Sequence, residues 1–294
     1  MPVSPTAVAP SPCPPESGRL QRVRGAVRLS VHRIGGASAL AGLYQSGSGK
    51  CLLPRCRDGR VEAVLLNTAG GLTGGDQLTI QLDVGPGGRL IASSQAAERI
   101  YRSTGDDASI SSRLTLAAGA RLDWLAQETI AFEGARLRRS LHVDMAPDAT
   151  LLAVEPLVLG RTAMGETVRS GRVSDQWRVR RGGRLVFADA LRLESPIDRL
   201  LATPASAGGA RAMATVLLVS PDAEERLDEV RSTLASATDA PDRADSDRTE
   251  AAASAWNGLL CVRLLSHDST ALRRRLCHLL TVIRGEPLPR VWAL

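Results

Sequence analysis

The chain has 294 residues, 44% of them apolar, which is enough to bury a substantial core in one large domain or two small ones. No apolar run approaches the ~18 residues of a membrane span, and the first residues lack the pattern of a signal peptide, so we expect a cytoplasmic protein without a membrane partner. The net charge is +6, but only two Phe and two Tyr are available to stack on bases, which favours acidic protein partners over nucleic acid.

The N-terminal segment, residues 1–18, reads MPVSPTAVAPSPCPPESG and holds six of the sixteen prolines. Almost none of its side chains can contribute to a core, so too little apolar burial is available to offset the entropy lost on ordering. We therefore predict a disordered tail over residues 1–18 and a single domain over residues 19–294.

Short apolar segments with period-2 alternation dominate the chain from there. They occupy residues 78–84, 110–116, 173–179 and 185–193, and turn signals rich in Gly, Pro and Asp separate such segments. This alternation predicts strands that are buried on one face. We expect a mainly β fold, an irregular β-helix-like stack of hairpins with two helices towards the C-terminal end.

The segment LLNTAGGLTGGD, residues 65–76, carries four glycines before a single aspartate, Asp76. A phosphate-binding loop needs a helix after its glycines, whereas here a strand over 61–66 precedes them and a strand over 78–84 follows them. The segment is therefore interpreted as a connection between strands. Four glycines exceed what a tight turn requires, which indicates that another backbone or a partner approaches closely.

The two predicted helices lie on either side of a charged stretch. Ser220 and Pro221 precede the first, and Asp268 and Gly285 bound the second. Between them, residues 237–254 predict a flexible acidic linker within the domain.

Five carboxylates are candidate site residues. Asp175 and Asp189 share the parity of the apolar residues on their strands, so both are predicted to point inward, where a charge must pair with an arginine, bind a cation or face a polar channel. Glu128 and Glu155 lie at strand ends, where a carboxylate can serve a site or cap a turn, and Asp76 ends the glycine segment. The four histidines have no metal-site spacing, and no G-x-S-x-G motif occurs, so no fixed imidazole site or serine hydrolase is predicted.

Six segments in order resemble the UreD (UreH) family of urease accessory proteins over roughly residues 20–294. They are LLNTAGGLTGGD (65–76), SSQAAERIYRS (93–103), LDWLAQETIAFEGARLRRS (122–140), LLAVEPLVLGRTAMGE (151–166), GRLVFADALRL (183–193) and LLTVIRGEPLPRVW (279–292). The chain departs from the family pattern at Ala126, where proline is usual, and at Ala131, where a bulkier apolar residue is usual.

The resemblance implies a non-catalytic maturation factor that binds apo-urease and UreF, with the GTPase UreG docked through UreF. It also implies that nickel is a transient cargo that passes through a polar interior, for which Asp76, Asp175, Asp189, Glu128 and Glu155 are the candidates. Weak oxygen ligation suits an ion that must leave again. A purely structural adaptor without a nickel path is the alternative, and a β-solenoid hydrolase would need paired carboxylates in one exposed cleft.

Overall fold

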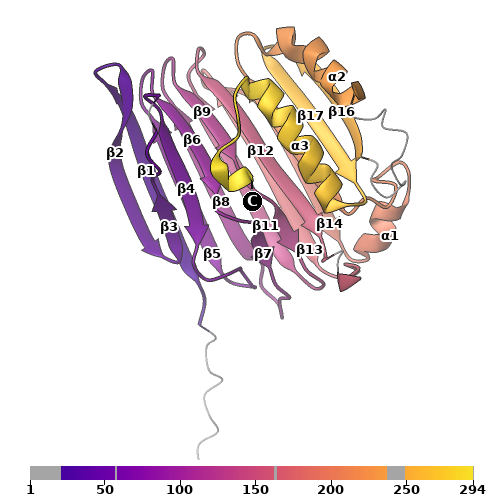
Figure 1. Ribbon diagram of the computed structural model, residues 1–294. Helices are drawn as coiled ribbons and strands as arrows, with labels where there is room; N and C mark the ends of the chain where they lie inside the picture. The colour runs from indigo at the N-terminus through magenta and orange to yellow at the C-terminus, as the bar shows by residue number, and fades with distance from the viewer. Residues whose placement is uncertain (1–20, 57, 162–163, 237–248, 294) are drawn as a thin grey trace, which may run out of the picture.

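The computed structural model describes residues 21–56, 58–161, 164–236 and 249–293, and Figure 1 shows two β-sheets packed face to face with helices on one side. The predicted disordered tail, residues 1–18, lies outside the described residues. The same holds for residues 237–248 of the predicted linker.

Sheet A has seven strands. In spatial order they are β14 (Arg184–Glu194), β13 (Arg172–Arg181), β11 (Arg136–Met145), β8 (Ala108–Leu116), β5 (Gln77–Val84), β1 (Arg24–Ile34) and β2 (Ala37–Gly47).

Sheet B has ten strands. Its main order is β16 (Thr249–Trp256), β17 (Leu259–Ser266), β15 (Ala212–Val219), β12 (Thr150–Leu159), β9 (Arg121–Leu125), β6 (Arg89–Ser94), β4 (Val61–Asn67) and β3 (Gly49–Leu52). The short strands β7 (Glu98–Ile100) and β10 (Thr129–Ala131) pair with each other, and β10 also pairs with β12.

Apart from the short strands β7 and β10, the chain alternates between the two sheets from β4 to β13, and each new strand lies parallel to the previous one of its sheet. The β-helix-like stack predicted from the sequence is therefore confirmed. Its repeating unit is a coil with one long strand in each sheet, whereas hairpins such as β1–β2 and β13–β14 close its ends. Period-2 alternation reports which face is buried but not the direction of the neighbouring strand, so the sequence did not separate coils from hairpins.

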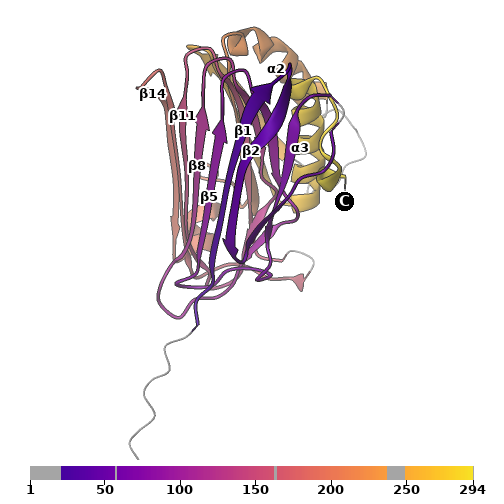
Figure 2. The ribbon, with the colours of Figure 1, turned by 90° about the vertical axis from the view of Figure 1, so that its left-hand side faces the viewer.

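The two sheets differ in what covers their outer faces. One core lies between the sheets, and a second lies between sheet B and the C-terminal helices. Strand β11 of sheet A alternates between buried and more accessible residues, whereas β12 of sheet B is buried at every position after its first. Figure 2 shows the reason: the helices cover sheet B, and the outer face of sheet A faces solvent.

Both predicted helices are present. Helix α2 spans Leu227–Ser236 after the 3-10 turn η2 (Ala223–Arg226), and α3 spans Ser269–Arg284. The Asp268 side chain accepts a hydrogen bond from the Ala271 N–H at 2.7 Å, and Gly285 ends α3 with φ of 68°. These are the capping roles that the sequence predicts.

Two segments correct the sequence-based expectations. The predicted flexible linker reached residue 254, but residues 249–254 belong to β16, which pairs with β17 and places the small side chains of Ala251, Ala253 and Ala255 against the outer core. The six-residue helix α1 (Ile197–Ala202) and the 3-10 turn η4 (Arg290–Trp292) were not expected. Both are too short for a helical period to be recognised.

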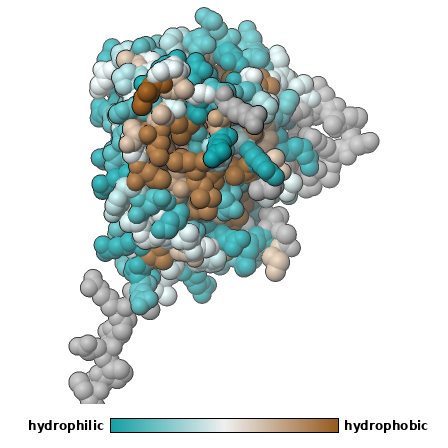
Figure 3. Space-filling view, turned by 60° about the vertical axis from the view of Figure 1, so that its left-hand side comes forward, coloured by the Kyte–Doolittle hydropathy of each residue, from teal (hydrophilic) through white to brown (hydrophobic). Residues whose placement is uncertain are grey.

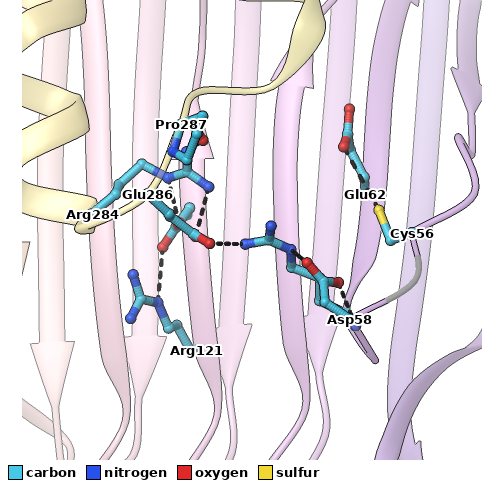
Figure 4. A network of polar contacts seen from close by, with 9 residues as sticks. Cys56, Asp58, Glu62, Arg121, Arg284, Glu286 and Pro287 are labelled. Carbon is cyan, nitrogen blue, oxygen red and sulfur yellow. Dashed lines mark hydrogen bonds and ion pairs between the residues drawn. The ribbon is translucent and has the colours of Figure 1, made fainter.

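An ion network joins the C-terminal end of α3 to sheet B (Figure 4), and its central pair, Arg284 and Asp123, is buried. Arg284, whose side chain is 1% exposed, donates from Nε to Asp123 at 2.9 Å and from Nη2 to Glu286 at 2.9 Å, and it also donates to the Pro287 carbonyl. Arg121 contacts the other oxygen of Asp123 at 3.2 Å, and Arg60 contacts Glu286. The Arg284–Asp123 and Arg60–Glu286 contacts each join residues more than 160 positions apart.

The end of the stack formed by β2 and β3 carries apolar side chains on its surface (Figure 3). Leu40 of β2 is 43% exposed and Leu52 of β3 is 58% exposed. Both strands are also the last strands of their sheets. An apolar surface at a sheet edge is suited to contact with another protein.

Candidate functional site

A buried ion cluster lies between the two sheets. Arg139 of β11 and Asp175 of β13 are register partners on parallel neighbouring strands, and both point inward. Arg139 Nη2 lies 2.5 Å from Asp175 Oδ2, and Arg139 Nε lies 3.2 Å from Glu155 Oε2, which comes from β12 of the facing sheet. The cluster therefore joins the two sheets through one guanidinium and two carboxylates.

Neighbouring polar groups fix the orientation of these side chains. Arg139 also donates to the Thr129 hydroxyl at 3.0 Å, and the Trp124 indole donates to Glu155 Oε1 at 3.1 Å. Burial raises the pKa of Glu155 to about 7, against the opposing effect of Arg139. Burial alone would lower the pKa of Arg139, but Asp175 and Glu155 raise it overall, so Arg139 remains a cation.

Three buried polar atoms of the cluster have no hydrogen-bond partner among the described residues, namely the donor Arg139 Nε and two carboxylate oxygens. Asp175 Oδ1 and Glu155 Oε2 are buried and have no hydrogen-bond partner among the described residues, although Glu155 Oε2 keeps its ionic contact with Arg139. An unsatisfied buried acceptor is costly. The same two oxygens are the atoms through which these carboxylates could coordinate a cation, together with water.

A cavity of about 260 Å³ lies beside the cluster. Its lining includes Arg139 and Glu155 as well as Gly70 and Gly71 of the glycine segment, with apolar walls from both sheets. The cavity thus connects the buried cluster with the glycine segment.

Glu98, which the sequence analysis did not single out, also lines this cavity. It lies on β7 and accepts a hydrogen bond from Asn67 Nδ2 at 2.9 Å. Burial raises the pKa of Glu98 to about 7, because the hydrogen bond from Asn67 only partly offsets the loss of water. A three-residue strand offers no alternation from which this position could have been predicted.

The glycine segment crosses from sheet B to sheet A, and its glycines allow close backbone approach as predicted. A Cβ on Gly71 would lie 2.8 Å from the Arg99 carbonyl, and one on Gly74 would lie 2.5 Å from the Asp106 carbonyl. Asp76 is buried and accepts the N–H groups of Val23 and Thr73, each at 2.8 Å. Asp76 therefore holds the segment in place and does not line the cavity.

The two other predicted carboxylates form ion pairs elsewhere. Asp189 of β14, the last strand of sheet A, lies 2.9 Å from Arg263 of β17 in sheet B. The Asp189 side chain is 22% exposed. Glu128 accepts two hydrogen bonds from Arg273 of α3, at 2.8 and 2.9 Å. The structure thus brings Asp175 and Glu155 together and keeps Asp76, Asp189 and Glu128 apart from them.

Within the described ranges, no three His, Cys, Asp or Glu residues are grouped so as to hold a metal ion. The Glu155–Asp175 pair offers carboxylate oxygens alone, a donor set that binds divalent cations weakly and reversibly compared with thiolates or imidazoles. None of the helices in the same ranges is long and apolar enough to cross a membrane.

The similarity to known proteins extends over nearly the whole chain. The sequence model of the UreD urease accessory protein family matches residues 23–293. The chain belongs to the UreD family. Curated relatives named urease accessory protein UreD include those of Xanthobacter autotrophicus, 50% identical over 93% of this chain and 91% of the relative, and of Azorhizobium caulinodans, 48% identical over 94% and 98%. The Brucella suis protein of the same name is 44% identical over 95% of this chain and 97% of its own.

Four of the six segments that resemble the UreD family meet at the cavity. They supply Asn67, Glu98, Trp124, Arg139 and Glu155 to its lining. Arg139 could have been found from the sequence, because it shares the parity of Leu137, Leu141 and Val143 on its strand. The segments by which the chain resembles the UreD family thus surround one internal site.

Proposed function

We propose that this chain is a maturation factor for urease that binds apo-urease and UreF, with UreG docked through UreF. The support for this assignment is the match to the UreD family over residues 23–293 and the name shared by the relatives. The chain itself performs no catalysis in this proposal, and GTP hydrolysis belongs to UreG. The apolar end of the stack around Leu40 and Leu52 offers a surface on which such a partner can dock.

We further propose that nickel, as cargo, passes through the cavity beside Arg139. The observation that carries this step is the cluster of one arginine and two carboxylates, of which Arg139 and Glu155 line a cavity built from the family segments, whereas Asp175 does not line it. Glu98 and Glu155, both with a pKa of about 7, can exchange a proton for a divalent ion near neutral pH. Asp175 Oδ1 supplies an acceptor that no described donor uses.

Co-purification followed by nickel counting tests the assignment. Urease subunits produced with UreF and UreG, with and without this chain, are isolated and their nickel content is measured. We expect the chain to co-purify with apo-urease and the nickel content to depend on it. Urease that acquires full nickel without the chain, or a chain that never binds apo-urease or UreF, would contradict the assignment.

The Glu98→Gln/Glu155→Gln double variant separates a nickel path from a purely structural adaptor. Both replacements keep volume and hydrogen bonding and mimic the protonated carboxyl, whose population is already substantial near neutral pH, so the fold should persist. A nickel path predicts normal assembly with urease containing less nickel. A structural adaptor predicts normal assembly with full nickel.

A further inference from the structure

The outer face of sheet A is open to solvent and has an unusual distribution of charge. Six strands, β1, β5, β8, β11, β13 and β14, place three successive rows of residues on this face. None of these positions holds a carboxylate, although the chain has 31 Asp and Glu. Solvent-facing rows normally mix both signs, because like charges side by side repel each other.

Two of the rows carry three arginines each, and in one of them the arginines are regularly spaced. Arg28, Arg113 and Arg178 lie in one row on every second strand, separated by Gln81 and His142. Arg24, Arg138 and Arg192 lie in the other row.

The side chains of the row between them are uncharged and shorter than arginine. Its members are Ala26, Thr79, Ser111, Ser140, Gln176 and Ala190. The three rows therefore form a shallow trough that crosses the strands, with arginines along both rims, here called the arginine trough.

Most of these arginines are available to a partner. Arg24, Arg113, Arg138 and Arg178 are exposed and make no ion pair or side-chain hydrogen bond with any other described residue. Arg28 stacks over Tyr44 at 5.4 Å, and Arg192 contacts Glu194 at 3.2 Å. Beyond the row that contains Arg28, the next row on this face holds two carboxylates, Asp83 and Asp144.

The spacing of the trough fits one kind of ligand. Strands lie about 4.8 Å apart, so arginines on every second strand are about 9.6 Å apart, and the two rims are about 13 Å apart because alternate residues advance about 6.6 Å. An α-helix is about 10–12 Å wide, and residues seven positions apart lie about 10.5 Å apart along it. A helix that lies across the strands would therefore bring a carboxylate every two turns to successive arginines of the row formed by Arg28, Arg113 and Arg178.

We infer that the arginine trough is a docking surface for an acidic helix of a protein partner. This inference rests on the proposed function in one respect, namely that apo-urease is used as one of the two probes. Charge complementarity of this kind raises association rates and sets orientation, and salt screens it. The trough has Tyr44 as its aromatic neighbour and no row of aromatic side chains on which bases could stack, which favours a protein helix over single-stranded nucleic acid.

The test compares two triple variants of equal charge. Arg113→Gln/Arg138→Gln/Arg178→Gln removes three charges from the trough. Arg199→Gln/Arg274→Gln/Arg290→Gln removes three exposed charges, likewise without ion pairs in the described structure, from α1, α3 and η4. Binding is measured over a range of NaCl concentrations with two probes. One is apo-urease, and the other is a helical peptide of about 20 residues with glutamates at i, i+7 and i+14 along both flanks.

We expect the trough variant to bind both probes about tenfold more weakly or worse, with a flatter salt dependence, and the control variant to match the wild type. Equal effects of the two variants, or no effect of either, would overturn the inference. A 20-base-pair DNA duplex that binds the trough more tightly than the peptide at equal salt, or self-association lost only in the trough variant, would overturn it too. If the wild type fails to bind apo-urease, the proposed function fails, and the peptide still decides the role of the trough.

Discussion

Two ion clusters in this molecule are built from arginines and carboxylates and differ in burial and in their balance of charge. The cluster beneath the end of α3 holds three arginines and three carboxylates: Arg60, Arg121, Arg284, Asp58, Asp123 and Glu286. In this first cluster, only Arg284 and Asp123 are buried. The cluster between the sheets holds one arginine, Arg139, and two carboxylates, Glu155 and Asp175.

The two clusters differ in how fully their carboxylates are compensated by arginine. In the balanced cluster every carboxylate meets at least one guanidinium, and Arg284 uses all three of its nitrogens. In the unbalanced cluster Asp175 Oδ1 and Glu155 Oε2 have no hydrogen-bond donor in the described structure, and the neighbouring cavity is lined by Arg139 and Glu155 but not by Asp175. A buried excess of negative charge costs free energy unless a proton or a cation compensates it. We therefore expect the first cluster to stabilise the fold, and we propose that a cation can compensate the second.

The largest expected effect comes from Arg139→Met, which leaves two buried carboxylates without their shared cation. We expect the free energy of unfolding to fall by upwards of ~5 kcal/mol, comparable with the stability of a whole domain. Adding Glu155→Gln and Asp175→Asn to this variant should restore much of the loss. Urea unfolding measures the stability of the single and the triple variant. A triple variant as unstable as Arg139→Met would show that the uncompensated charge does not cause the loss of stability.

Arg284→Met is expected to cost about 3–5 kcal/mol, because Asp123 then stays buried with only the half-exposed Arg121 as a partner. Arg274→Met, on the exposed side of the same helix, is the matched control and should change stability by less than ~0.5 kcal/mol. Equal losses in both variants, measured by urea unfolding, would mean that helix propensity and not the ion network decides the outcome.

The free energy of unfolding should depend on pH through the buried Glu98 carboxyl, with an effect of intermediate size. Its pKa is raised by burial from 4.5 to about 7 in the folded chain, so between these values the folded state binds more protons than the unfolded state. Stability should therefore be highest below pH 4.5 with respect to this group, and should decline as the pH rises towards 7.

The Glu98→Gln variant removes this titration. We expect it to be more stable than the wild type at pH 8 by roughly 1–3 kcal/mol and to show a flatter profile between pH 5 and 8. Glu250→Gln, at an exposed position of strand β16, serves as the control. An unchanged profile for Glu98→Gln would show that Glu98 is hydrated in solution.

The smallest effect is expected for Asp189→Asn, because its partner Arg263 is 55% exposed and keeps its charge hydrated. The loss should be at most about 1 kcal/mol. High salt should reduce the difference from the wild type further, since the pair lies at the edge of the sheets. A loss similar to that of Arg284→Met in thermal and urea unfolding would place this pair with the buried clusters.

Much of the fold could be predicted because its signals are local. Alternation at 78–84 and 173–179 gave strands, and Asp268 and Gly285 gave the ends of α3, since caps and strand faces depend on residues close in sequence. The strand at 249–256 was missed because its alternation uses alanine beside acidic and polar residues, which resembles a linker in composition.

The candidate site was predictable only in part. Parity showed that Asp175 points inward, but its partner Arg139 is set by the register of parallel strands, and Glu155 arrives from the opposite sheet. Glu128 meets Arg273 from 145 positions away. Contacts of this kind depend on how the coils stack, which no local pattern encodes.

The nickel content of urease matured with Asp175→Asn, compared with urease matured with Asp189→Asn, tests the central claim most directly. Both substitutions remove one carboxylate from an arginine, but only Asp175 belongs to the unbalanced cluster beside the cavity. If the cluster carries nickel, both variants assemble with urease and UreF, and only Asp175→Asn yields urease with less nickel. Full nickel loading with Asp175→Asn, at normal stability and assembly, would contradict the account.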